Sequence, residues 1–138
     1  MIASDGEGAS KLITCRLGGA KDVPSAKKLA KSVINSPLVK CAMFGADANW
    51  GRVLCAHGYA GVPADVSKIG VAFASAAGSV EVCKNGAGVD FSEETAKAVL
   101  SEPEIEILIT MGDGAASATA YGCDLTYDYV KINGDYRT

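Results

Sequence analysis

Apolar and polar positions alternate along several short stretches of the chain, and this period of two predicts β-strands. The alternating stretches are residues 11–17, 69–75, 79–83, 104–109, 115–121 and 125–130. Glycine-containing turns separate several of them. The pattern therefore predicts a hairpin between residues 69–75 and 79–83, and a second pairing in which residues 115–121 return alongside residues 104–109.

Helices are predicted where apolar residues recur every three or four positions. The clearest case follows Asp22, which can cap a helix whose first turn holds Pro24. Ser36 and Pro37 end this helix, because the residue before a proline is disfavoured in the helical conformation. A further helix is predicted after Ser92, which is followed by two glutamates in the first turn.

Residues 47–52 lead into a short helix that Asp47 or Asn49 can cap. The amino end of that helix would form a modest anion site together with Arg52. The same residues are equally consistent with a capped helix in which Trp50 fills a gap in the core. The sequence leaves both interpretations open.

Residues 38–44 form a short apolar run after the first helix, which predicts a second strand and hence a β-α-β unit. Such a unit favours parallel neighbours, and antiparallel pairing stays open. The order of elements predicts the α/β (α+β) class, with a mixed sheet and a few helices packed on it. No repeat or linker interrupts residues 1–138, which predicts a single domain.

Length and composition narrow the classes of function. The chain has 138 residues, of which 49% are hydrophobic and 21% charged, values typical of a globular domain. Its formal net charge of -3 argues against nucleic acid or an anionic membrane as a partner. No apolar run approaches the roughly 20 residues of a membrane span. The first residues lack the features of a signal peptide, so we expect a cytoplasmic protein.

The five cysteines are widely spread, and none forms a CxxC pair. With His57 as the single histidine, no metal site is expected. The cysteines are instead predicted to be buried thiols in a reducing compartment. His57 has no catalytic partner in the sequence and is interpreted as structural.

Two stretches near the ends of the chain carry polar side chains in an unusual sequence context. Glu7 lies between two glycines in residues 5–9, where an exposed turn is the preferred interpretation from the residues alone. The chain stops soon after the last predicted strand, with hydrogen-bonding side chains that include Asn133 and Thr138. Chain ends are usually frayed, so this tail is predicted to be docked, either to serve a site or to tie down the last strand.

Both stretches resemble sequence blocks of the ornithine acetyltransferase family (glutamate N-acetyltransferase, arginine biosynthesis). Residues 5–11 (DGEGASK) resemble its DGEGATK block, and residues 123–138 resemble its closing CDLTYDYVKINADYRT run, with Gly134 in place of alanine. Residues 36–40 (SPLVK) and 47–52 (DANWGR) resemble two further blocks, with Ala48 where proline is common. The blocks occur in family order from one end of the chain to the other.

The resemblance implies that the chain is the C-terminal segment of a larger self-cleaving acetyltransferase fold. In that family a threonine, freed at the start of the second (β) chain by self-cleavage, carries the acetyl group. Its surrounding motif is absent here, and Ala118-Thr119-Ala120 is not that motif. We therefore expect no catalytic residue in this sequence. Glu7, Asn133 and Thr138 match substrate-binding positions of the family.

The implied activity moves an acetyl group from N-acetyl-L-ornithine to L-glutamate without a cofactor, and some family members also accept acetyl-CoA. The implied partners are the N-terminal (α) chain and the rest of the β chain, in a dimer of two-chain protomers (a heterotetramer). This chain alone is expected to be inactive, with apolar surface exposed where the missing part would pack. The alternative is a non-catalytic binding or assembly module that keeps half of the pocket.

Overall fold

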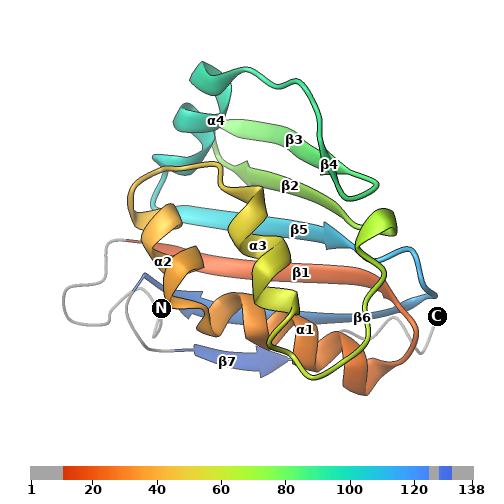
Figure 1. The fold of residues 1–138 in the computed structure, drawn as a ribbon. Coiled ribbons are helices and arrows are strands. Elements are labelled where there is room, and N and C mark those ends of the chain that lie inside the picture. The colour runs from red at the N-terminus through yellow and green to blue at the C-terminus, as the bar shows by residue number, and fades with distance from the viewer. Residues whose placement is uncertain (1–10, 125–127, 132–138) are drawn as a thin grey trace.

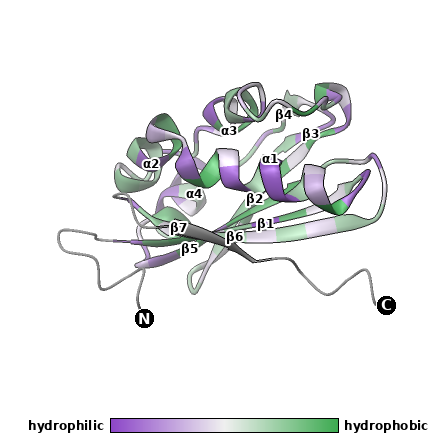
Figure 2. Cartoon of the chain, turned by 90° about the horizontal axis from the view of Figure 1, so that it is seen from below, coloured by the Kyte–Doolittle hydropathy of each residue, from purple (hydrophilic) through white to green (hydrophobic). Residues whose placement is uncertain are grey.

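The computed structural model describes residues 11–124 and 128–131 of the chain. They form a seven-stranded mixed sheet in the order β4-β3-β2-β5-β1-β6-β7, with the helices gathered on one face (Figures 1 and 2). The strands are β1 (Leu12–Ala20), β2 (Gly70–Ser75), β3 (Gly78–Lys84), β4 (Ala87–Gly88), β5 (Glu104–Thr110), β6 (Ala116–Cys123) and β7 (Asp128–Lys131). The helices are α1 (Val23–Asn35), α2 (Pro37–Phe44), α3 (Trp50–His57) and α4 (Glu93–Leu100), with a 3-10 turn η1 (Val66–Lys68). The predicted α/β class with a mixed sheet is confirmed.

The centre of the sheet is β1, which runs parallel to β5 and antiparallel to β6. Alternate residues of these strands point into a core under the helices, among them Cys15 and Ile107, which are fully buried. α1 packs on β1 and β6, and α4 packs on β2 and β3. Among the described residues, no helix covers the opposite face of the sheet (Figure 2).

Helix α1 begins and ends where the sequence predicts. The side chain of Asp22 accepts a hydrogen bond from the Ser25 N–H at 2.8 Å, and Pro24 lies in the first turn. Ser36 follows the helix in an extended conformation. The prediction for α4 is also confirmed, because the Ser92 hydroxyl accepts a hydrogen bond from the Thr95 N–H at 3.1 Å.

The predicted strand at residues 38–44 is wrong, because these residues form helix α2. Ser36 not only ends α1 but also caps α2, and its Oγ accepts a hydrogen bond from the Val39 N–H at 3.3 Å. Pro37 suits the first helical position because its missing N–H would have no partner there. Val39, Ala42 and Met43 are the buried residues of α2, which is helical rather than strand spacing. The expected β-α-β unit is therefore absent at this point of the chain.

The predicted pairing of residues 104–109 with 115–121 is also wrong. Both stretches are strands, but β1 lies between β5 and β6 in the sheet. The turn after β5 is held against the far end of β1, where the Gly19 carbonyl accepts a hydrogen bond from the Asp113 N–H at 2.7 Å. β1 runs on to Ala20 through a register shift after Leu17, past Gly18 and Gly19 and beyond the alternating stretch 11–17.

The expectation of buried cysteines holds for three of the five. Cys41 and Cys55 are exposed, because they lie on the outward sides of two helices whose inner sides pack on the core. None of the five cysteines, all of which lie within the described residues, forms a disulfide. Within the described part of the chain, none of the helices has the length and apolar character needed to cross a bilayer.

Candidate substrate-binding site

The three predicted binding residues, Glu7, Asn133 and Thr138, lie outside the described residues, so their roles remain predictions. The structure does describe the residues through which their segments join the sheet. Lys11 precedes β1 and follows the segment that contains Glu7. β7 precedes the segment that contains Asn133 and Thr138.

The ammonium group of Lys11 lies at the carboxyl ends of two helices. Its Nζ donates to the carbonyl oxygens of Met43 at 2.6 Å and Phe44 at 3.4 Å, both in the last turn of α2. It also donates to the carbonyl oxygen of Leu100, the last residue of α4, at 2.7 Å. An ammonium group has three N–H donors, and each finds a carbonyl acceptor here. Carbonyls at helix ends lack partners within the helix and attract cations.

The main chain at Lys11 is also fixed on two sides. Its carbonyl oxygen accepts a hydrogen bond from the Asp124 N–H at 3.4 Å, directly after β6. The next residue, Leu12, donates its N–H to the carbonyl oxygen of Pro103 at 2.8 Å, directly before β5. Lys11 and Leu12 together therefore connect the start of β1 with the ends of β6, α2 and α4 and with the residue before β5.

Two opposing effects set the pKa of Lys11. Burial removes the ammonium from water and lowers its pKa, while the nearby carboxylate of Asp124 acts in the opposite direction. A lysine placed among carbonyl dipoles and a carboxylate is suited to holding segments together as a cation.

The strands that border the two terminal segments, β1 and β7, both pair with β6, which lies between them in the sheet. Leu12 at the beginning of β1 pairs with Cys123, whereas Lys131 at the end of β7 pairs with Thr119. Cys123 and Thr119 are four residues apart along β6, which is about 13 Å at the usual rise per residue. The start of β1 therefore lies at the carboxyl end of β6, whereas β7 runs toward the amino end of β6, so the described strands do not bring these two points to one level.

The residue block 47–52 has a structural explanation. The Asn49 side chain caps α3 by accepting a hydrogen bond from the Arg52 N–H at 3.1 Å, so Asn49 and not Asp47 is the cap. The guanidinium of Arg52 donates from Nη1 to the carbonyl oxygen of Leu38 at 3.2 Å and so ties α3 to α2. Trp50 packs partly buried against the core, beside Gly88 of β4. Between the two interpretations left open by the sequence, these contacts favour the capped helix over an anion site.

Comparisons with known proteins show the family of the chain. The ArgJ family model matches residues 1–138. The chain belongs to the ArgJ family. It is 52% identical to the arginine biosynthesis bifunctional protein ArgJ 1 of Clostridium acetobutylicum over 138 residues, which are 100% of this chain and 34% of that protein. It is 48% identical to the glutamate N-acetyltransferase of Methanopyrus kandleri over 99% of this chain and 35% of that protein.

The fold agrees with a solved ArgJ structure as well. A crystal structure of the arginine biosynthesis bifunctional protein ArgJ from Bacillus halodurans is 43% identical and superposes with a TM-score of 0.83. The match covers 93% of this chain and 59% of that chain. The present chain therefore has the ArgJ fold over nearly its whole length, while it spans about a third of the length of the curated relatives that it matches.

Thr119, in the Ala-Thr-Ala run, is fully buried in the middle of β6 in this ArgJ-family chain. Its main chain pairs with Arg16 on one side and with Lys131 on the other. A residue enclosed by neighbouring strands in this way is poorly placed to attack a substrate. The location of the nucleophile remains a prediction.

Sequence reasoning assigned no role to Lys11, the last residue of the DGEGASK block, and interpreted His57 as structural. Nothing local in the sequence predicts the contacts of Lys11, because its acceptors lie 32 to 89 residues away in the chain. His57 is 3% exposed, and neither ring nitrogen has a hydrogen-bond partner among the described residues. Burial lowers the pKa of His57 to about 4, so its imidazole is neutral at pH 7.

Two hollows lie on opposite sides of the sheet. One of about 660 Å³ lies among α1, α2 and the end of α3, where Lys31, Leu38 and Tyr59 contribute to its wall. The other, of about 510 Å³, lies on the face without helices and includes Arg16 and Glu106, whose side chains form an ion pair at 2.5 Å. In the part of the chain that the structure describes, no group of three or more histidine, cysteine or acidic residues is arranged to bind a metal.

Proposed function

We propose that this chain is the C-terminal segment of a glutamate N-acetyltransferase that moves an acetyl group from N-acetyl-L-ornithine to L-glutamate in arginine biosynthesis. The observation that carries the proposal is the ArgJ family match across residues 1–138, together with relatives of about 50% identity. One of these relatives is named glutamate N-acetyltransferase, and others are named arginine biosynthesis bifunctional proteins. We place the complete protein in the cytoplasm.

The proposed reaction has two steps on a threonine outside this sequence. In the first, the threonine hydroxyl attacks the acetyl carbonyl of N-acetylornithine, and the threonine's own amine takes the hydroxyl proton. The amide bond breaks, and ornithine leaves after its nitrogen has accepted a proton. In the second, the amine of glutamate attacks the acetyl-threonine ester, which forms N-acetylglutamate and restores the hydroxyl. No cofactor is needed, and acetyl-CoA is an additional acetyl donor in bifunctional members.

This chain would supply the part of the pocket that holds the amino-acid substrate. Glu7 is proposed to pair with the side-chain ammonium of ornithine, because a carboxylate is the natural partner of a cation. Asn133 and Thr138 are proposed to hydrogen-bond the α-carboxylate or the amide of the substrate. The α chain and the rest of the β chain would complete each protomer, and two protomers would form the dimer.

The alternative function is a non-catalytic binding or assembly module. The chain spans about a third of the length of its curated relatives. Such a module would keep the fold and the binding segments without any chemistry.

An acetyl-exchange assay with N-acetylornithine and glutamate separates the two. It would be run on the 138-residue chain alone and on the chain co-expressed with the upstream segment of its protein. Activity only in the co-expressed protein is the expected result. Activity in neither sample would favour the module, and turnover by the chain alone would contradict the absence of a nucleophile.

The binding roles are tested in the active protein. Glu7→Gln and deletion of Thr138 should mainly raise KM for N-acetylornithine, because each removes a ground-state contact to the substrate. Asp5→Asn is the matched control for the first change, since it removes a carboxylate two residues away in the same block. Unchanged kinetics in both Glu7→Gln and the deletion would refute the assignment.

A further inference from the structure

We propose that the hollow beside His57 binds a small neutral molecule with an apolar body and one hydroxyl group, and that this hydroxyl hydrogen-bonds the imidazole of His57. The hollow lies where α3 ends and the chain continues to η1. The proposal does not depend on the proposed acetyl transfer.

The hollow has the size and the wall of a site for a small molecule. Its volume is about 430 Å³, and sites for small molecules usually measure about 300–1,000 Å³. The residues that line it belong to one stretch, 54–66, and besides His57 and two glycines they are Leu54, Val62, Pro63, Ala64 and Val66. Among these described residues, no other side chain of the wall can pair with the imidazole. A group that reaches the imidazole through the hollow therefore has to belong to the occupant.

The imidazole of His57 is a buried polar group in need of a partner. It is 3% exposed, and neither Nδ1 nor Nε2 has a hydrogen-bond partner in the described part of the chain. Buried polar groups in folded proteins nearly always have a partner, because an unpaired group has lost its hydrogen bonds to water. With no such bond to fix the ring, a half-turn about the Cβ–Cγ bond exchanges a carbon edge for a nitrogen edge within the same ring plane. The side chain can therefore present a nitrogen to an occupant without breaking a described hydrogen bond.

The ionisation of His57 favours a hydroxyl group on the ligand. Burial lowers the pKa of His57 to about 4, so at pH 7 its ring is neutral and has one N–H donor and one acceptor nitrogen. A hydroxyl group both donates and accepts hydrogen bonds, so it can pair with either nitrogen.

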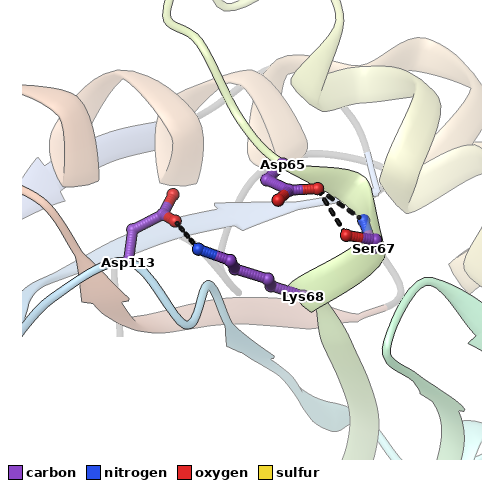
Figure 3. Close-up of polar contacts among 4 residues, drawn as sticks. All are labelled: Asp65, Ser67, Lys68 and Asp113. Carbon is purple, nitrogen blue, oxygen red and sulfur yellow. Dashed lines mark hydrogen bonds and ion pairs between the residues drawn. The ribbon is translucent and has the colours of Figure 1, made fainter.

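The charges close to the hollow favour a neutral ligand. Asp65 follows Ala64 of the wall, but its carboxylate accepts hydrogen bonds from the N–H and the hydroxyl of Ser67, at 3.1 and 2.6 Å (Figure 3). In the same view, the ammonium of Lys68 is paired with the carboxylate of Asp113 at 3.6 Å. None of these charged side chains lines the hollow. A charged ligand would therefore lose hydration there without gaining a counter-charge.

The first test is an NMR titration of the 138-residue chain with phenol and with toluene. The two probes have nearly the same shape and differ in the hydroxyl group. His57 is the only histidine of the sequence, so the imidazole nitrogen resonances report on this residue alone. Phenol should shift these resonances together with the amide resonances of residues 54–66, whereas toluene should shift mainly the amide resonances. The proposal is wrong if phenol leaves the imidazole nitrogens unchanged.

The second test combines both probes with H57F. The dissociation constant of toluene divided by that of phenol should be about tenfold lower in H57F than in the wild type, because one hydrogen bond inside the hollow is lost. Equal ratios in the two proteins would contradict a hydrogen bond between the ligand and His57.

A further pair of variants tests the location and keeps His57 in place, so it decides the question even if H57F does not fold. A64F puts a phenyl group on the wall of the hollow and should prevent binding of both probes. A98F makes the same change at an exposed position of α4 and should leave binding unchanged. Full binding to A64F, or equal losses in both variants, would place the probes elsewhere and refute the site.

The competing occupant is a side chain from the rest of the protein, because the chain spans about a third of the length of its curated relatives. Equilibrium dialysis of phenol against the complete, co-expressed protein distinguishes the two. The complete protein should bind phenol with an affinity similar to that of the chain alone, and H57F should weaken this binding. Binding to the chain alone and not to the complete protein would show that a protein segment fills the hollow, and the proposal of a free ligand would fail.

Discussion

As the pH is lowered from 6.5 to 4, the free energy of unfolding is predicted to decrease because of one residue, His57. Its side chain is 3% exposed, and within the described part of the chain its ring nitrogens have no hydrogen-bond partner. Burial lowers its pKa from 6.5 to about 4. In the unfolded chain the imidazole takes up a proton near pH 6.5, whereas in the folded chain it stays neutral down to about pH 4. The unfolded state binds more protons over this interval, so stability rises with pH across it and is lost as the pH falls.

The size of this loss follows from the difference between the pKa of His57 in the unfolded and in the folded chain. Each unit of pKa difference is equivalent to about 1.4 kcal/mol, so the interval from 6.5 to about 4 corresponds to a loss of about 3 kcal/mol. That is a large fraction of the stability of a typical domain. The side chains around the neighbouring hollow, including Leu54, Val62 and Val66, are apolar and offer no charge that would stabilise the imidazolium.

The assay is urea unfolding of the chain at a series of pH values, for the wild type and for His57→Phe. The phenylalanine variant should show a much smaller change between pH 6.5 and pH 4. Tyr59→His in the His57→Phe background is the matched control, because it places an imidazole at a position that is 88% exposed and should not restore the slope. Parallel slopes in wild type and His57→Phe, or an imidazole NMR titration of folded wild type near pH 6.5, would refute the reasoning.

Three further predictions concern packing, capping and thiol reactivity. Gly88→Ala would place a Cβ 2.7 Å from the ring of Trp50, so we expect urea unfolding to show a loss of about 1–3 kcal/mol in the free energy of unfolding. Gly18→Ala is the control and should cost less, because no atom lies within 4 Å of the new Cβ. Asn49→Ala removes the cap of α3 and should lower the free energy of unfolding by about 1 kcal/mol, and Asn49→Asp, which keeps an acceptor oxygen, should restore it. A maleimide should modify Cys41 and Cys55 in the folded chain, and rapid labelling of all five thiols would contradict the structure. The thiols expected to react only after unfolding are Cys15, Cys83 and Cys123.

The elements that sequence reasoning predicted correctly have local causes. α1 and α4 each begin at a side chain that caps the helix, and each keeps a helical spacing of apolar residues. β5 alternates Ile105, Ile107 and Ile109 with exposed or partly exposed residues, so its period of two is visible without the fold. Patterns of this kind can be recognised within a single segment, without knowledge of the rest of the fold.

The errors arose where the outcome depends on distant segments. The apolar run after Ser36 is short enough to fit a strand or a helix, and its buried side is decided by packing against α1 and α3. Similarly, a glycine-rich turn after β5 suggests a hairpin, but β1 occupies the position beside β5. The contacts of Lys11 belong to the same class, because their partners come from two helices far along the chain. The binding roles of Glu7, Asn133 and Thr138 came from family resemblance, and they remain predictions.

The structure shows where large apolar side chains are exposed among the described residues. On the face without helices, β5 presents Glu104 and Glu106 together with the partly buried Leu108, and Glu106 pairs with Arg16 of β1. That face is therefore partly charged. The large apolar side chains that are exposed among the described residues are Leu38, Phe44, Tyr59 and Val66.

These four side chains belong to α2, the segment after α3, and η1, all outside the strands. Leu38 and Tyr59 also line the hollow among α1, α2 and α3, which places apolar surface and a concave shape together. The ion pair on the bare sheet face would have to be desolvated if an apolar surface covered it, which costs free energy that apolar contacts must offset. Association of the chain through apolar surface would therefore begin at the helical layer and not at the bare face of the sheet.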